Sequence, residues 1–175
     1  YMFQADALMP WRTGIDNVIA GLEFRGVPRG DAVAQGEAWL RRVGLAGFGD
    51  RYTHQMSGGM RKRLALAQTL ILSPRILLMD EPFSALDVQT RQLMENELLA
   101  LWAEDRKSVL FITHDLEEAI YLGDRVIGLL PNPGRIGTIA KVTLPRPRNQ
   151  LETREMAEFL RLRRALFDFI GKAEG

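Results

Sequence analysis

The sequence predicts an α/β fold in which a mostly parallel sheet follows a helical N-terminal segment. Two observations support this prediction. From residue 75 onward, short apolar runs alternate with stretches of helical periodicity, which is the order that βαβ units of a parallel sheet produce. Before residue 74, apolar residues recur at helical spacing, and glycine and proline separate the segments.

Three helices are expected in the first part of the chain. Thr13 and Asp31 are suitable N-caps for the first two, and Ser57 for the third. The expected helices cover residues 13–24, 31–43 and 57–72, and the glycine-rich residues 44–56 are expected to form a loop.

The second part should alternate between strands and helices. Strands are expected at 75–79, 108–113 and 125–130, and helices at 88–104 and 116–122. Residues 135–144 indicate one or two further strands, with a possible hairpin bend at Gly137. A final helix over 152–170 carries one apolar stripe, which we interpret as core or self-packing. The stripe consists of Met156, Phe159, Leu160, Phe167 and Ile170.

The composition is that of a globular protein. The chain has 175 residues, of which 46% are hydrophobic and 26% are charged, enough for one domain of ordinary size. No apolar stretch approaches the ~20 residues that a membrane span needs, so a membrane role would require a partner. Cysteine is absent, which excludes disulfides and cysteine metal sites.

The net charge of +1 gives no general attraction to nucleic acid. The charge is uneven, however. Residues 131–175 contain nine Lys and Arg against five Asp and Glu, a balance of +4, whereas residues 1–130 contain fourteen and seventeen, a balance of −3. We interpret the basic tail as a solvated helix face, with a specific anionic partner as the alternative.

Two adjacent carboxylates, Asp80 and Glu81, follow the apolar run at 76–79. Ligands of open α/β sheets bind at the carboxyl ends of the strands, and buried acids need a partner for their charge. We assign Asp80 to Mg²⁺, through water, and Glu81 to polarising a water that attacks a γ-phosphate. A strand end with solvated acids is the alternative.

Ser57, Gly58 and Gly59 stand where the third helix should begin. Free N–H groups and the helix dipole make such a start an anion site, and glycines let a phosphate approach the backbone. A simple serine N-cap is the alternative.

His114 follows the strand at 108–113, where it could donate to a phosphate and orient water, although a structural role is open. His54 is interpreted as structural. Ser84 and Asp87 could cap the next helix. Alternatively, Asp87 reaches across a dimer interface.

In this order the motifs resemble those of ATP-binding cassette (ABC) transporter ATPases, a P-loop NTPase-like fold, over essentially the whole chain. Gln4 resembles the Q-loop glutamine, and residues 56–60 the signature. Residues 76–81 resemble Walker B with Glu81 as catalytic glutamate. Residues 84–87 resemble the D-loop, with Asp87 among the nucleotide-site residues, and His114 resembles the switch histidine.

The resemblance is closest to importers of nitrate, sulfonate, taurine and bicarbonate. Met60 replaces the common glutamine of the signature, as it does in that subgroup. The segments 133–136 and 144–148 are also similar to it. The transported solute is not encoded in these motifs.

One part of the family pattern is absent from the sequence. No Gly-x-x-x-x-Gly-Lys-Ser/Thr occurs, and the only Gly-Lys pair is Gly171-Lys172. We interpret the chain as an N-terminally truncated cassette that lacks the first half of the core. It is expected to bind ATP poorly and not to hydrolyse it alone.

The resemblance implies a head-to-tail homodimer that closes around ATP and Mg²⁺. Ser57, Gly58, Gly59 and Met60 would contact the partner's nucleotide. Asp80, Glu81, His114 and Gln4 would contact the chain's own, with Gln4 also sensing Mg²⁺. Further implied partners are transmembrane permease subunits and, indirectly, a solute-binding protein, with the ATPase at the cytoplasmic face of the membrane and no role for nucleic acid.

By motif, the chain divides into three parts. Residues 1–73 hold the Q-loop, helical subdomain and signature helix, 74–150 the catalytic core, and 151–175 the C-terminal helix. Two other functions stay open: a non-catalytic module that binds a transporter, and a soluble ABC ATPase of DNA repair or translation. The second would need a coiled-coil insertion or tandem cassettes, and neither occurs in the sequence.

Overall fold

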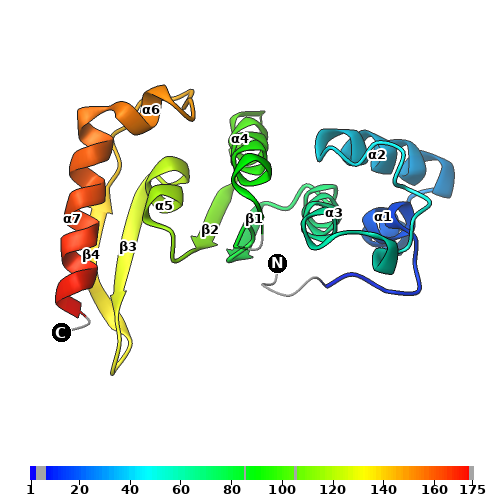
Figure 1. The fold of residues 1–175 in the computed structure, drawn as a ribbon. Coiled ribbons are helices and arrows are strands. Elements are labelled where there is room, and N and C mark those ends of the chain that lie inside the picture. Colours follow the sequence, from blue (N-terminus) through cyan, green and yellow to red (C-terminus); the bar gives the residue numbers. More distant parts are fainter. Residues whose placement is uncertain (3–6, 85, 105, 174–175) are drawn as a thin grey trace. The chain divides into compact units, whose positions relative to one another are not determined.

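The computed structural model describes residues 1–2, 7–84, 86–104 and 106–173. The chain forms two compact units, residues 1–112 and 113–175, and each is considered by itself. The division by motif at residues 73 and 150 concerns function and stays a prediction. The elements are shown in Figure 1.

The first unit combines four α-helices and a parallel strand pair among its described residues. Its elements are α1 (Gly14–Phe24), α2 (Arg29–Arg42), the 3₁₀ turn η1 (Thr53–Gln55), α3 (Gly58–Leu70), β1 (Ile76–Asp80), α4 (Val88–Glu104) and β2 (Ser108–Ile112). Strands β1 and β2 pair in parallel from Ile76↔Ser108 to Asp80↔Ile112. The predicted helices and strands of this unit are therefore confirmed to within a few residues.

Strand β1 also has a neighbour on its other edge. Met2 forms a parallel bridge with Met79, its N–H donates to the carbonyl of Leu78 at 2.8 Å, and the Asp80 N–H donates to the Met2 carbonyl at 3.1 Å. Met2 and Met79 are both buried. Backbone hydrogen bonds on both edges therefore fix the end of β1, from which the two acids follow.

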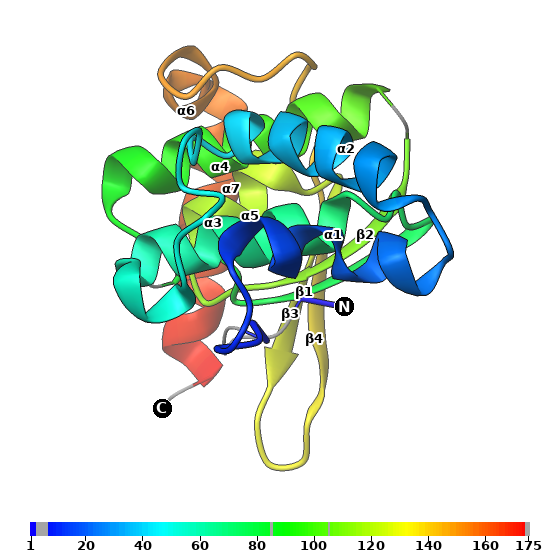
Figure 2. The same cartoon turned by 90° about the vertical axis from the view of Figure 1, so that its right-hand side faces the viewer.

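Helix α1 packs against both α2 and α3 (Figures 1 and 2). The Thr13 side chain accepts from the Asp16 N–H, as the predicted cap requires. Asn17 is fully buried beside it, where its amide group bonds to the backbone of Met9, Arg12 and Thr13. These bonds close the loop before α1 onto the helix.

The predicted N-cap of the second helix was wrong. Helix α2 begins at Arg29 after Pro28, with no side-chain cap, and Asp31 lies inside its first turn. A proline just before or at the start of a helix has a fixed φ and needs no N–H partner, so it begins the helix without a capping oxygen. The end before Gly44 is confirmed, since that glycine has a φ of +68°.

The second unit contains α5 (Leu116–Leu122), β3 (Arg125–Leu130), β4 (Arg135–Lys141), α6 (Glu152–Glu155) and α7 (Ala157–Ala173). Strands β3 and β4 form an antiparallel hairpin, and α7 runs alongside it (Figure 1). Gly128 and Gly137 make room for α7, because a Cβ at either would lie 2.6 Å from the ring of Phe169. The predicted strand after residue 134 is thus one strand, paired with β3.

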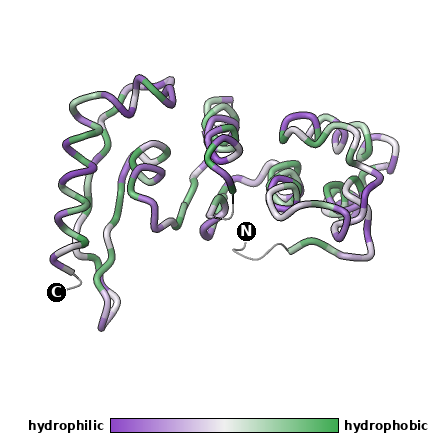
Figure 3. The backbone as a smooth tube through the Cα atoms, in the orientation of Figure 1, coloured by the Kyte–Doolittle hydropathy of each residue, from purple (hydrophilic) through white to green (hydrophobic). Residues whose placement is uncertain are grey.

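The predicted apolar stripe of the last helix was partly wrong. The helix is interrupted at Met156, and the buried side chains of α7 are Phe159, Leu162 and Leu166. Leu160, Phe167 and Ile170 are exposed, Phe167 by 66%. Figure 3 shows apolar and polar residues alternating along this helix. The sequence is therefore compatible with more than one choice of the buried helix face.

Candidate functional site

Asp80 and Glu81 lie where β1 ends, and both side chains are half-buried. The Glu81 N–H donates to the carbonyl of Ile112 at 2.9 Å, which extends the pairing with β2 by one residue. Glu81 has a φ of +43°, a left-handed conformation that costs a non-glycine residue about 1–2 kcal/mol. Backbone strain of this kind concentrates at functional sites, so it favours a functional role for this carboxylate.

The segment after Glu81 is a tight turn that leads into α4. The N–H and the hydroxyl of Ser84 both donate to the Glu81 carbonyl, at 3.3 and 3.0 Å. Asp87 accepts from the Thr90 N–H at 3.0 Å, and hydrogen bonds from Thr90 lower the pKa of its carboxyl. Asp87 therefore caps α4, whereas Ser84 stabilises the turn at Glu81. A contact of Asp87 across a dimer interface stays a prediction.

Ser57 caps α3, with its Oγ accepting from the Met60 N–H at 3.2 Å. Ser57 and Gly58 are exposed, and Gly59 and Met60 are partly exposed. Packing does not require either glycine. A Cβ at Gly58 would come no closer than 3.9 Å to Arg61, and one at Gly59 no closer than 3.7 Å to Leu86. The open surface over this helix start suits an anion that approaches the backbone.

The start of α3 lies beside the turn that follows Glu81. The space above Gly59 ends at Leu86, in the segment between Ser84 and the Asp87 cap. Within the first unit, the fold thus brings together the two motifs that the sequence singled out. A further residue at this helix start, not predicted from the sequence, is Arg61. Its guanidinium lies nearest to the space over Gly58 and donates to the Met56 carbonyl at 2.9 Å. The sequence signal for Arg61 is a basic residue that follows two glycines in the first turn of a helix.

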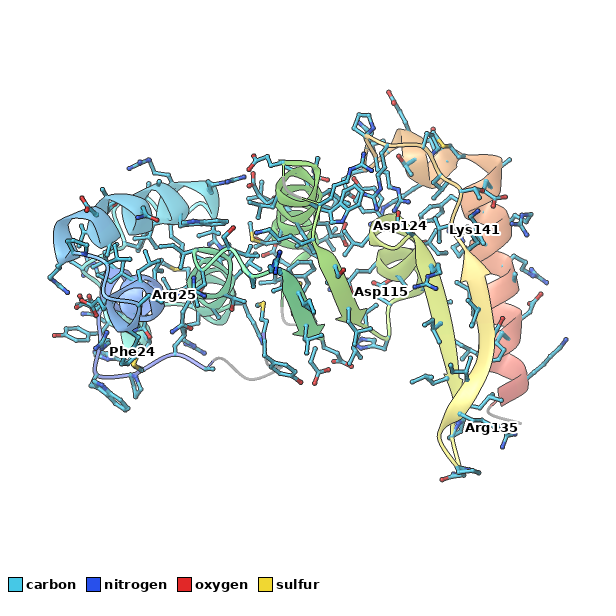
Figure 4. All side chains as sticks on the ribbon, turned by 180° about the vertical axis from the view of Figure 1, so that it is seen from behind. Phe24, Arg25, Asp115, Asp124, Arg135 and Lys141 are labelled. Atoms are coloured by element: carbon cyan, nitrogen blue, oxygen red, sulfur yellow. The ribbon has the colours of Figure 1, made fainter. Side chains whose placement is uncertain are left out.

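His114 is exposed in the second unit, immediately before α5. The next residue, Asp115, caps α5 by accepting from the N–H groups of Glu117 and Glu118 at 2.9 and 3.2 Å. Figure 4 labels Asp115 there. The placement of His114 relative to Glu81 stays a prediction. Gln4 lies outside the described residues.

His54 stacks on Tyr52, with ring centroids 5.6 Å apart and planes 14° from parallel. This contact agrees with its interpretation as a structural residue.

The residues present suit Mg²⁺ only together with a nucleotide. Among the described residues no three His, Cys, Asp or Glu side chains gather into a metal site. Mg²⁺ in nucleotide sites keeps several waters and needs only one or two carboxylates besides the phosphates. Asp80, half-buried at the strand end, fits that requirement.

Comparisons with known proteins identify the family to which this sequence is similar. Residues 1–84 match the family model described as ABC transporter. The chain is 47% identical over 169 residues to an uncharacterized ABC transporter ATP-binding protein of Methanocaldococcus jannaschii, covering 97% of this chain and 62% of that protein. It is 49% identical over 135 residues to the taurine import ATP-binding protein TauB of Pseudomonas putida, covering 77% and 52%.

A solved structure supports the fold. The dimeric post-hydrolysis structure of the ATP-binding cassette MJ0796, bound to ADP and Pi, is similar with a TM-score of 0.72 and 31% identity, over 81% of this chain and 61% of that one. These similarities place the chain in the ABC transporter family. Within it, the chain is part of an ATP-binding domain and spans roughly half to two thirds of its relatives' length.

Within the described residues, the structure contains no helix with the length and apolarity that a membrane crossing requires.

Proposed function

We propose that the intact protein is the ATP-hydrolysing subunit of an ABC importer. The observation that carries this proposal is the strained, half-buried Glu81 at the carboxyl end of a parallel strand, in the same unit as an uncrowded glycine helix start. An acid that can accept a proton and a helix start that can bind phosphate are what phosphoryl transfer to water needs. Family membership supports the same reaction.

In this proposal Glu81 polarises the attacking water. Its backbone is held by the Ile112 carbonyl and by both donors of Ser84, so the position from which its side chain starts is fixed. A general base must reach the proton it takes within hydrogen-bond distance, so this fixed backbone serves the reaction. Asp80 holds Mg²⁺, which would neutralise charge on the phosphates when bound.

The helix start of α3 binds the γ-phosphate of a nucleotide held by a second copy of the protein. The dimeric state of the similar cassette, with its bound ADP and Pi, supports this arrangement. Ser57 supplies a hydroxyl, and Gly58 and Gly59 leave the backbone N–H groups accessible. Gln4 and His114 complete the site on the chain's own nucleotide. Gln4 senses Mg²⁺, and His114 donates a hydrogen bond to the phosphate.

We further propose that the transported solute is a small anion or zwitterion of the sulfonate or taurine type. Support comes from the 49% identity to a taurine import ATP-binding protein and from a second such relative, of Rhizobium johnstonii, at 45% over 152 residues. The partners would be permease subunits and, through them, a solute-binding protein. The protein would lie at the cytoplasmic face of the membrane.

Substitution of Glu81 by glutamine tests the catalytic role. In the intact native protein, Glu81→Gln should retain ATP binding and lose about 10²–10⁴-fold in turnover, the contribution of a general base. The exposed Glu155→Gln in α6 is the matched control and should hydrolyse ATP normally. Hydrolysis by Glu81→Gln at the native rate would exclude this residue as the base.

A second candidate, which holds only if these residues are the whole product, is a non-catalytic module that binds a transporter without hydrolysing ATP. The intact mass of the native protein separates the two. A mass clearly above 19.8 kDa leaves room for that loop and favours the ATPase, whereas a mass equal to it favours the module.

A further inference from the structure

Arginines from the C-terminal segment hold helix α5 at both ends. The central one is Arg148, whose side chain is only 1% exposed. Its Nη1 donates to three carbonyls at the end of α5, those of Ile120, Tyr121 and Gly123, at 3.4, 2.6 and 3.0 Å. The last carbonyls of a helix have no partner inside the helix, and a cation there also opposes the helix dipole.

Arg146 reinforces the same end. It donates to the Leu122 carbonyl at 3.1 Å and to Asp124 at 2.9 Å. Figure 4 labels Asp115 and Asp124, which lie before and after α5. The Tyr121 hydroxyl donates back to the Arg148 carbonyl at 3.3 Å, so helix and segment are tied in both directions.

The first turn of α5 is held by two other arginines. Glu117 accepts from Arg154 at 2.7 Å and from Arg163 of α7 at 2.9 Å. The Arg154 guanidinium also lies 5.1 Å from the ring centre of Tyr121. We call Arg146, Arg148, Arg154 and Arg163 the arginine clamp. These four are among the nine basic residues of the tail, so part of its positive charge is engaged within the chain, by carbonyls of α5, by Asp124 and by Glu117.

Burial of the Arg148 guanidinium costs desolvation free energy, so a gain in stability is not a sufficient reason for an arginine at this position. Desolvation lowers the pKa of its guanidinium to about 10. A buried charge is often no more stabilising than a well-packed apolar side chain, but it does impose one geometry. Helix α5 has only seven residues, too few to be stable by itself, so its position depends on such contacts.

That position also sets the position of His114. Asp115 caps α5, and its own N–H donates to the Thr113 hydroxyl at 3.0 Å. His114 stands between these two residues, directly before the helix. Any shift of α5 along its axis therefore moves the backbone of His114.

We propose that Arg148, supported by the rest of the arginine clamp, is a positioning residue that holds His114 in place for ATP hydrolysis. The inference rests on the proposed function, because it assigns His114 to the reaction. Substitution of Arg148 should therefore lower turnover by displacing His114, and it should leave nucleotide binding unchanged.

The test is a double-mutant cycle on the intact native protein, with kcat and KM for ATP measured for each variant. Arg148→Met should lower kcat about tenfold with KM unchanged, within the loss that a misplacement of ~1 Å causes. In a His114→Ala background the same substitution should have little further effect. Arg148→Lys, which keeps the charge, should restore part of kcat. Arg164→Met, at a position 81% exposed on α7, is the control and should change nothing.

Independent losses in kcat from Arg148→Met and His114→Ala would overturn the inference, since they would show only a structural role. If Arg148→Met does not fold, Glu117→Gln decides by the same cycle, because it releases the clamp at the exposed end. Failure of the proposed function would give a different result, because the unaltered protein would then not hydrolyse ATP and there would be no kcat to compare.

Discussion

Gly36 in α2 and Gly58 at the start of α3 lie in the same unit, but packing requires glycine only at Gly36. A Cβ at Gly36 would come within 2.6 Å of both Ile15 and Ile19 of α1, so the packing of two helices requires the small residue. A Cβ at Gly58 would find nothing closer than 3.9 Å. The fold accounts for the first glycine and leaves the second unexplained.

The difference in the space around these two glycines distinguishes residues required by internal packing from residues suited to binding a ligand. Buried Ile15 and Ile19 belong with Gly36 in the α1–α2 packing. Exposed Ser57 belongs with Gly58, at an open helix start. A residue that no internal contact requires, on a surface suited to anions, is best explained by what approaches from outside.

The largest effect should come from a bulky side chain at the open helix start. Ser57→Arg should weaken ATP-dependent dimerisation of the intact protein by more than ~100-fold, about 2.7 kcal/mol, because the side chain fills the space where the nucleotide of the second copy would lie. Ser57→Thr keeps a capping oxygen and serves as the control. Sedimentation with and without ATP measures the effect. Unchanged dimerisation of Ser57→Arg would show that this surface does not face a second copy.

The complementary change is a bulky side chain in the α1–α2 packing. Gly36→Leu should lower the free energy of unfolding by ~1–3 kcal/mol, the usual cost of overpacking, since Ile19 Cγ2 lies close to its own backbone and cannot move aside. Gly30→Leu in the same helix has open space and is the control. Urea unfolding compares the two. Equal midpoints would mean that the helices separate easily.

A methyl group alone gives the sharpest version of the comparison. Gly58→Ala should leave the free energy of unfolding unchanged or raise it by up to ~1 kcal/mol, because alanine favours helix. It should nevertheless weaken ATP-dependent dimerisation about tenfold, or 1.4 kcal/mol. Urea unfolding and sedimentation on one preparation give both values. If the methyl group had no effect on dimerisation, the phosphate would not approach the backbone closely at this residue.

Much of the fold could be predicted because local signals agreed with tertiary packing. Thr13 and Ser57 precede helices that begin where a capping oxygen allows. Prediction failed where two local signals competed. Because Pro28 precedes Arg29, α2 begins two residues ahead of Asp31. In α7, Leu162 is buried and Leu160 is exposed, the reverse of the predicted stripe.

The candidate site divides in the same way. The strand end at Asp80 and Glu81 and the helix start at Ser57 are short-range patterns, which the sequence displays directly. The contact between Gly59 and Leu86 joins distant segments, as does the reach of Arg148 to α5. No periodicity encodes such pairings, because they depend on where separate elements pack. In the sequence, Arg146 and Arg148 therefore stand out only through the similarity of segment 144–148 to a subgroup of importers.

The smallest effect concerns the surface of the same α1–α2 pair. Arg29 of α2 donates to Asp16 and Glu23 of α1 at 2.7 and 2.6 Å. Its hydrogen bond lowers the pKa of the Asp16 carboxyl below the ordinary 3.8. A lowered carboxyl pKa stabilises the fold above the unfolded-state value, and this contribution is lost as the pH falls through the folded-state value.

Asp16→Asn should therefore cost less than ~1 kcal/mol near neutral pH, the usual value of an exposed ion pair, and the cost should shrink as the pH falls below 3.8. Urea unfolding as a function of pH measures it, with Asp31→Asn, exposed on α2, as control. A difference that does not change with pH would show that the effect of Asp16 does not come from the charge of its carboxyl. Either way, it should remain smaller than the Gly36→Leu effect, because interior packing rather than surface charge joins these two helices.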